Sequence, residues 1–150
     1  MLKRLALIGA GCLGILGSQS ASAEPADNSE IVRSALTDMF VKRDPGAAER
    51  YFSTDYIQHN PRFANGRDVL PGLITSLPAD FRYEMGMMVA EGDLVMVHNR
   101  YTSIAPSPMI AVDIYRVRDG RIVEHWDVLQ EETPASGSAN GNAMFNVGER

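Results

Sequence analysis

The fold of this 150-residue chain follows from one stretch near its C-terminal end, residues 109–130, which reads MIAVDIYRVRDGRIVEHWDVLQ. Two runs of β-branched, aromatic and aliphatic residues flank the turn sequence Arg118-Asp119-Gly120, a pattern typical of an antiparallel hairpin. Residues 81–104 repeat the pattern with two runs joined at Glu91-Gly92-Asp93. The second half of the chain is therefore predicted to be an antiparallel sheet.

Helices are predicted ahead of this sheet. Apolar residues recur at helical spacing within residues 27–44, with Asp27 or Ser29 as the expected N-cap. A short second helix is expected after Asp44, and a third over residues 66–77. Helices followed by a run of antiparallel strands predict the α+β class.

Residues 1–23 have the pattern of a secretory signal peptide: a basic start, a short apolar run and small residues before an expected cleavage site. The apolar run is too short to span a bilayer. Cys12, the only cysteine, lies inside it, and the sequence around Cys12 favours simple export over lipidation. We expect a mature domain over 24–132, a polar tail over 133–150, and a periplasmic or secreted location without membrane attachment after cleavage.

The charge balance limits the classes of partner. The chain carries 19 acidic against 14 basic residues, a formal net charge of −5. Loss of the first 23 residues would remove two basic residues and no acidic one. Nucleic-acid binding proteins usually present a basic face, and none is visible here, so nucleic acid is not an expected partner.

The turn at Asp119-Gly120 allows two registers. A two-residue turn would put Asp113 opposite Trp126 and leave Asp113 and Asp127 on opposite faces of the sheet. A turn with Gly120 as a bulge residue would put Asp113 opposite His125. We expect the second register, because it sorts the hairpin into a polar and an apolar face. The polar face would hold Asp113, Tyr115, Val123, His125 and Asp127, and the apolar face Val112, Ile114, Ile122, Trp126 and Val128.

Each face then needs an explanation. Ionised side chains are costly in a dry core unless they are paired, so the polar face indicates a cavity. Asp113 and His125 alone could instead be a cross-strand ion pair that only stabilises the hairpin. Asp127, a second carboxylate on the same face, favours the cavity. The apolar face with Trp126 requires a cover, either a helix layer or another subunit.

With these residues identified, the chain resembles the SnoaL-like family of the nuclear-transport-factor-2-like superfamily. The resemblance covers roughly Ile31 to Phe145. It rests on YIQHNP at 56–61, NGRD at 65–68 and SANGNAMF at 138–145, and above all on VDIYRVRDGRIVEHWDVLQ at 112–130.

The resemblance implies a cone-shaped α+β barrel, in which a curved antiparallel sheet wraps around N-terminal helices to form a deep pocket. It implies a homodimer through the sheet face that carries Val112, Ile114, Trp126 and Val128. Founding members of the family are polyketide cyclases that close a ring by aldol condensation without a metal or cofactor. The motif positions of their acid/base aspartate and its partner correspond to Asp127 and Asp113. The cyclases have histidine at the second position, so this chain departs from them there.

Further side chains are candidates for the site. His59 is a candidate catalytic residue, and it is expected with Asn60 just after a helix, where both could hydrogen-bond a substrate carbonyl. His98, His125 and Tyr115 are candidate substrate-binding residues. The three histidines lack the spacing of a zinc site, so no metal is expected, and the resemblance implies that no cofactor is needed.

Two functions remain open from the sequence. As an enzyme, the protein would carry out acid/base chemistry of the isomerase, aldol cyclase or hydratase type on a small carbonyl compound, with Asp127 transferring the proton. As a binding module, the same pocket would hold a hydrophobic small molecule and its polar groups would only orient that ligand.

Overall fold

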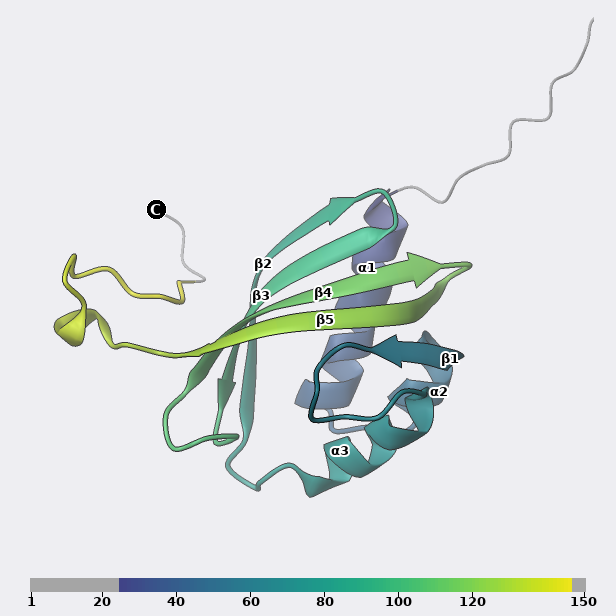
Figure 1. Cartoon of the computed structure of the whole chain (residues 1–150), viewed down its shortest axis with the longest axis horizontal. Helices are drawn as coiled ribbons and strands as arrows, with labels where there is room; N and C mark the ends of the chain where they lie inside the picture. The colour runs from purple at the N-terminus through teal and green to yellow at the C-terminus, as the bar shows by residue number, and fades with distance from the viewer. Residues whose placement is uncertain (1–24, 147–150) are drawn as a thin grey trace, which may run out of the picture.

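The computed structural model describes residues 25–146, so the predicted signal peptide lies outside the described residues. The elements are α1 (Pro25–Leu36), the π-helical turn η1 (Thr37–Val41), α2 (Ala47–Tyr51), β1 (Phe52–Gln58), η2 (Arg67–Val69), α3 (Leu70–Ser76), β2 (Arg82–Glu91), β3 (Leu94–Thr102), β4 (Met109–Arg118), β5 (Arg121–Glu131) and η3 (Ala135–Gly137). Helices and a strongly curved sheet pack against each other (Figure 1), and the predicted α+β class is confirmed.

The sheet has the strand order β1-β5-β4-β3-β2. Strands β2 to β5 are antiparallel neighbours, as predicted from the two hairpins. Strand β1 was not predicted, and it adds to the free edge of β5 in the parallel direction. The expectation that His59 and Asn60 follow a helix is therefore wrong: they follow β1, beside the middle of β5.

The predicted helices are present, with one correction. Helix α1 begins at Pro25, earlier than a cap at Asp27 or Ser29 would allow, since a proline in the first turn loses no intrahelical hydrogen bond. Before α2, the Asp44 carboxylate accepts a hydrogen bond from the Gly46 amide at 2.8 Å. Proline lies in the first turn of α3, as expected.

The register of the β4–β5 hairpin differs from both alternatives considered above. Asp119 and Gly120 have φ values of 50° and 72° and form a two-residue turn that pairs Arg118 with Arg121. The register then shifts by one residue at Val123. The extra residue is a β-bulge in β5 rather than in the turn.

Because of this bulge, the ionisable side chains lie on one face of the hairpin as predicted, but each lies opposite a different residue from the predicted one. Asp113 lies opposite Asp127, and Tyr115 lies opposite His125, so the predicted pairing of Asp113 with His125 is wrong. All four side chains nevertheless share the inner face, because the bulge changes the register by an even number of residues from the predicted one. Ile122, which precedes the bulge, is fully buried in the core instead of lying on the outer face.

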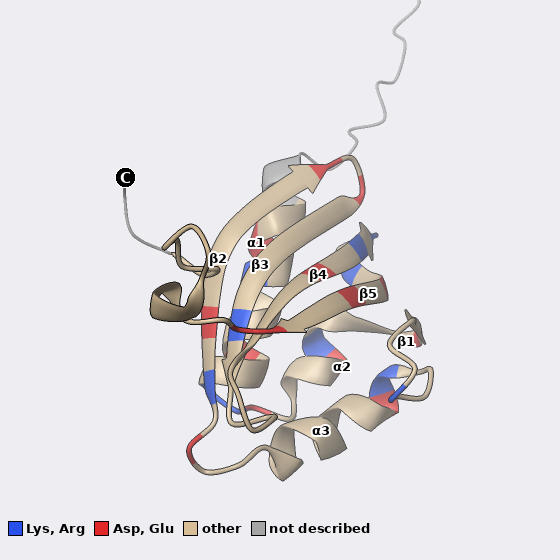
Figure 2. Cartoon of the chain, turned by 60° about the vertical axis from the view of Figure 1, so that its left-hand side comes forward, with Lys and Arg blue, Asp and Glu red and all other residues tan. Residues whose placement is uncertain are grey.

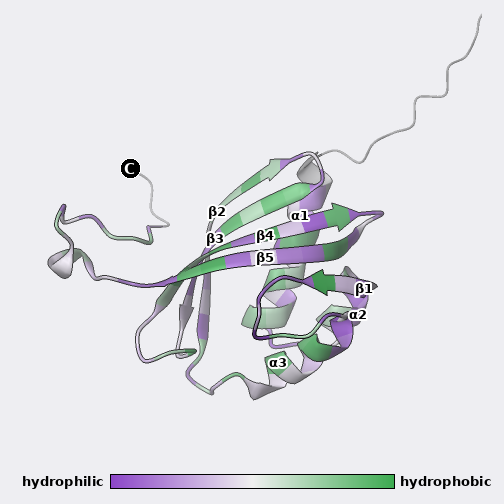
Figure 3. Cartoon of the chain, viewed as in Figure 1, coloured by the Kyte–Doolittle hydropathy of each residue, from purple (hydrophilic) through white to green (hydrophobic). Residues whose placement is uncertain are grey.

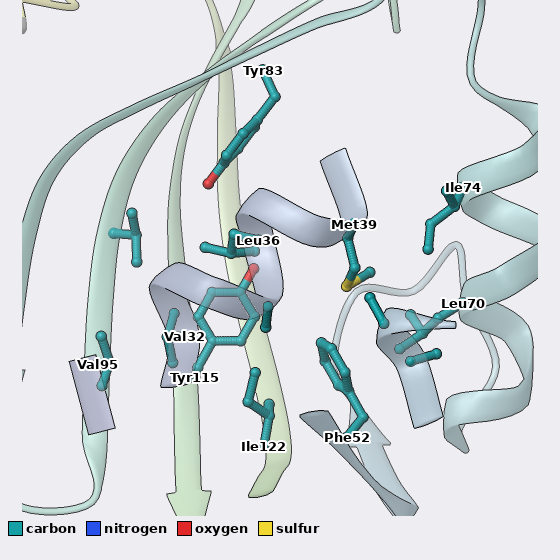
Figure 4. Packing of buried hydrophobic residues seen from close by; sticks show 14 of the residues in the cluster. Val32, Leu36, Met39, Phe52, Leu70, Ile74, Tyr83, Val95, Tyr115 and Ile122 are labelled. Carbon is teal, nitrogen blue, oxygen red and sulfur yellow. The ribbon is translucent and has the colours of Figure 1, made fainter. Parts of the chain in front are cut away.

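The core lies between the sheet and the helices. Figure 4 shows Val32 and Leu36 of α1 facing the inner side of the sheet. Leu70 and Ile74 of α3 close the core on the other side, towards Phe52 at the start of β1. Hydrophobic residues follow β2, β3 and β4 and recur on α3 in Figure 3, which is the pattern that a shared interior requires.

The tail folds back onto the outer face of the sheet. Phe145 is 8% exposed, and its ring lies 5.4 Å from that of His98 on β3. Gly86 on β2 leaves the space for it, since a Cβ there would lie 2.9 Å from the Phe145 ring. The described part of the tail therefore packs on the side of the sheet opposite the core.

Two features bear on partners. In Figure 2, basic and acidic segments are interspersed along the chain, and no element carries a continuous basic stripe. Among residues 25–146, no helix is long and apolar enough to cross a membrane.

Candidate active site

A cavity of about 360 Å³ opens between the sheet, α1 and α3. Its wall is mainly apolar and aromatic, with side chains such as Leu36, Phe52, Leu70, Phe81 and Leu129. Such a wall with a few convergent polar groups is typical of a small-molecule site. The polar groups used below come from β3, β4, β5, the end of β1 and the segment that follows it.

Asp127 is a half-buried carboxylate in the cavity wall. The Asn60 side chain donates a hydrogen bond to its Oδ2 at 2.6 Å. The Arg62 backbone amide donates to Asn60 Oδ1 at 2.9 Å, which fixes the orientation of the Asn60 amide. Asn60 therefore acts as a donor to Asp127, and one oxygen of this carboxylate has no protein donor among the described residues.

Asp113 is more deeply placed, with only 3% of its surface exposed. Its Oδ2 accepts hydrogen bonds from Asn99 Nδ2 at 2.6 Å and from the Tyr101 hydroxyl at 2.7 Å. Asn99 also donates to the Val97 carbonyl at 3.1 Å and accepts from the Tyr83 hydroxyl. The buried carboxylate is thus held by donors from β3, which offsets much of its desolvation cost.

The other oxygen of Asp113 contacts His125, with Oδ1 and Nε2 3.1 Å apart. His125 Nδ1 lies 2.9 Å from Gln58 Oε1. The Asn60 backbone amide donates to the same Oε1 at 2.9 Å, so this atom must be the oxygen of the Gln58 amide. His125 Nδ1 must then carry a proton.

This tautomer has a chemical consequence. With its Nδ1 protonated, His125 can form the hydrogen bond to Asp113 only if one more proton lies between Nε2 and Oδ1. The proton can reside on the imidazole or on the carboxyl group. Asp113 and His125 therefore form a pair that holds one proton, next to the second carboxylate, Asp127.

Two tyrosines of the cavity wall keep their hydroxyl protons at neutral pH and can therefore donate hydrogen bonds. Burial, reinforced by the nearby Asp113 carboxylate, raises the pKa of Tyr101 and of Tyr115 well above the usual value of 10.0. Tyr101 uses its hydroxyl on Asp113, whereas the Tyr115 hydroxyl has no hydrogen-bond partner among the described residues. Figure 4 shows the Tyr115 ring reaching from β4 towards α1.

Asp113, His125 and Asp127 also form the metal-binding candidate of the described residues, since one ligand atom of each lies within 4.8 Å of the others. Two carboxylates and an imidazole are suitable donors for a divalent transition metal. A metal would have to replace the hydrogen bond between Asp113 and His125. The proton-sharing pair accounts for this geometry without a metal.

The structure brings five of the seven predicted site residues together. Asp127, Asp113, His125, Tyr115 and Asn60 all line the cavity.

His59 points away from the cavity, contrary to the predicted placement. Its ring stacks on Trp126 on the outer face, with centroids 4.7 Å apart and planes inclined by 6°. Its Nε2 lies 2.9 Å from Glu124. The reason is strand alternation, because Gln58 and Asn60 point inwards from this segment and His59 between them points outwards.

His98 is also outside the cavity. It lies opposite Val112, on the outer face of the sheet, while its neighbours Val97 and Asn99 point inwards. Its Nδ1 is buried without a hydrogen-bond partner.

Sequence reasoning missed Gln58, Asn99 and Tyr101. A signal for two of them was present, because Val95 and Val97 mark the apolar face of β3 and Asn99 and Tyr101 continue that alternation. Gln58 had no such signal, since its position depends on the unpredicted strand β1.

Comparison with known families supports this architecture. Residues 32–125 match the sequence model of the family described as the SnoaL-like domain. No curated protein sequence matches the chain.

Several solved structures share the fold at low identity. A candidate ketosteroid isomerase from Kribbella flavida has a TM-score of 0.62 at 17% identity, over 71% of this chain and 80% of that one. An epoxide hydrolase of the LEH-like type from M. tuberculosis has a TM-score of 0.59 at 17% identity, over 71% and 84%. IdmH, a candidate polyketide cyclase from Streptomyces antibioticus, has a TM-score of 0.53 at 21% identity, over 68% and 91%. At these identities the likeness establishes the fold alone.

Proposed function

Since the chain belongs to the SnoaL-like domain family, we propose that it is an enzyme that moves a proton next to the carbonyl group of a small, mainly apolar compound. The observation that carries this proposal is that one largely apolar cavity holds both Asp127 and Tyr115. Among the described residues, one Asp127 oxygen has no donor and the Tyr115 hydroxyl has no hydrogen-bond partner. A base and a hydrogen-bond donor in a largely apolar site are the groups that enolisation needs.

In the proposed reaction, Asp127 removes a proton from the carbon beside the carbonyl. Negative charge then develops on the carbonyl oxygen, where the Tyr115 hydroxyl donates a hydrogen bond. Return of the proton to another carbon gives isomerisation. Attack of the enolate on a second carbonyl gives aldol cyclisation, and loss or addition of water gives hydratase-type chemistry.

The Asp113–His125 pair would support this step electrostatically. Its shared proton keeps the pair at a net charge of zero when Asp113 is ionised and His125 is protonated, or when both are neutral. Asp127 is then the only unpaired charge at the inner end of the cavity. Gln58 would act as a positioning residue, since it fixes the tautomer of His125.

The test is proton exchange in heavy water on a panel of ketones, including a β,γ-unsaturated cyclic ketone, followed by proton NMR. We expect Asp127→Asn to slow exchange about 10²- to 10⁴-fold and Tyr115→Phe to slow it about 10²-fold. Asp55→Asn, at an exposed acid on β1, is the matched control and should leave the rate unchanged.

The alternative function is a non-catalytic binding protein for a hydrophobic small molecule. The predominantly apolar cavity wall favours it as a second candidate. If Asp127→Asn lowers ligand affinity only a few-fold and no ketone exchanges faster than in buffer, the binding function replaces the catalytic one.

We further propose that the chain is exported to the periplasm or the medium, with cleavage before Glu24. Edman sequencing of the protein recovered from the host's periplasm or medium tests this, and a start at Met1 would contradict it.

We also propose a homodimer through the outer face of the sheet. Val112 and Val128 lie opposite each other on β4 and β5 and remain 40% and 71% exposed, and the adjacent outer-face pair is Ile114 opposite Trp126. Val128→Glu should convert a dimer to a monomer in sedimentation velocity, and a monomeric wild-type protein would refute the interface.

A further inference from the structure

Arg62 is unlike the other cations of the domain. Among the lysines and arginines that the structure describes, it is the only one whose side chain has no hydrogen bond, ion pair or ring contact. It is exposed, and it lines the cavity that contains Asp127. An arginine without a partner is a strong donor to a carboxylate, because its guanidinium matches the two oxygens.

The Arg62 backbone is linked to Asp127 through one side chain, that of Asn60. The Asn60 amide accepts from the Arg62 backbone amide at 2.9 Å and donates to Asp127 at 2.6 Å. The Phe63 amide donates to the Asn60 carbonyl at 3.2 Å and closes a tight turn. Although one amide links them, the Arg62 guanidinium and the Asp127 carboxylate form no ion pair, so the cation stays available to a ligand.

The exposed residues of the wall mark the mouth of the cavity. Besides Arg62, they include Phe63, Ile104 and Leu129, which are 38%, 41% and 38% exposed. The exposed wall also includes Ser76 and Pro78, so the mouth is mainly apolar and carries one charged group, the Arg62 guanidinium. The inner end carries the Asp127 carboxylate beside the net-neutral Asp113–His125 pair, so a ligand anion would be repelled there.

From this distribution of charge we infer that the ligand is an amphipathic keto acid. Its carboxylate binds Arg62 at the mouth, its apolar body lies against the aromatic and aliphatic wall, and its carbonyl end points inwards to Asp127. This inference rests on the proposed function for the role of the carbonyl, but the recognition of the anion at Arg62 can be measured separately. The negative net charge of the chain opposes the binding of an anion, so a preference for the anionic ligand has to come from a local cation such as Arg62.

The test compares γ-benzoylbutyrate with its methyl ester, two aryl ketones that differ in the anionic group, by isothermal titration calorimetry. Wild-type protein should bind the acid about fivefold more tightly than the ester, as expected for one partly exposed ion pair. Arg62→Gln should remove this preference and leave the affinity for the ester unchanged. Arg118→Gln removes the same charge from the far end of the β4–β5 hairpin and should keep the preference.

Several results would overturn the inference: equal affinities in the wild type, an equal loss in both arginine variants, which would indicate only long-range attraction, or no binding of either compound. The outcomes also separate this inference from the proposed function. If exchange depends on Asp127 but the acid has no advantage, only the keto-acid inference fails. If the acid preference depends on Arg62 while Asp127→Asn leaves exchange unchanged, the catalytic proposal fails and the anion site stands.

Discussion

Replacing Asp113 by Leu should be among the most destabilising single changes in the domain. Asp113 is 3% exposed and accepts hydrogen bonds from Asn99 and Tyr101, while His125 contacts its second oxygen. Leucine would leave an amide N–H, a hydroxyl and an imidazole nitrogen without a partner. At about 1–3 kcal/mol for each buried group, and with partial relief from rotation of the tyrosine hydroxyl, we expect a loss of roughly 3–5 kcal/mol in the free energy of unfolding.

Asp113→Asn is the matched control for this change. The asparagine oxygen can accept from Asn99 and Tyr101, and its NH₂ can donate to an unprotonated His125 Nε2. Its stability should therefore stay within about 1 kcal/mol of the wild type.

Urea unfolding followed by far-ultraviolet circular dichroism measures all three proteins. If the free energy of unfolding of Asp113→Leu lies within about 1 kcal/mol of that of Asp113→Asn, water from the cavity satisfies the three polar groups. The reasoning that Asp113 organises the network is then refuted.

Two further predictions concern other parts of the fold. Hydrogen bonds from Lys42 and Arg50 hold the pKa of Asp38 at about 2, below the ordinary value of 3.8. The ionised Asp38 should therefore stabilise the fold fully above pH ~4, and protonation as the pH falls through ~2 should lower the free energy of unfolding by about 2 kcal/mol. Urea unfolding at a series of pH values should show this loss in the wild type and not in Asp38→Asn, and parallel curves would contradict it. Gly86→Ala would place a Cβ 2.8 Å from a backbone oxygen and 2.9 Å from Phe145, so it should displace the tail. Limited chymotrypsin digestion at Phe145 should be faster in this variant, and an unchanged rate would show that the tail is not held by this packing.

The β4–β5 hairpin shows how local and tertiary information divide. Alternation in the sequence was enough to place Asp113, Tyr115, His125 and Asp127 on one face. A shift of one residue would move every side chain to the opposite face, so a sheet with one buried face strongly specifies which residues point inwards. It was not enough to give the partners, since the bulge at Val123 changes the register without leaving a glycine or any other local mark. A prediction of face therefore survived an error in pairing.

His59 and His98 show the opposite case. His59 was predicted to belong to the site mainly from the family resemblance and His98 from its place on the strand, yet both lie on the outer face of the sheet. For His98, the alternation of Val95 and Val97 on β3 already indicated that the histidine side chain points outwards. For His59, the direction of the side chain depends on β1. This short strand forms by pairing in the parallel direction with the edge of β5, some 70 residues further along the chain.

The sequence by itself determined the α+β class, the four antiparallel strands and the gathering of ionisable groups on one face, because turn chemistry and side-chain alternation are local properties. Only the tertiary structure decided which groups meet. Gln58 and Asn60 reach His125 and Asp127 because β1 lies beside β5, and Asn99 and Tyr101 reach Asp113 because β3 lies beside β4. The protonation of His125 and the donor to Asp127 both follow from contacts between segments distant in sequence, which no local pattern encodes.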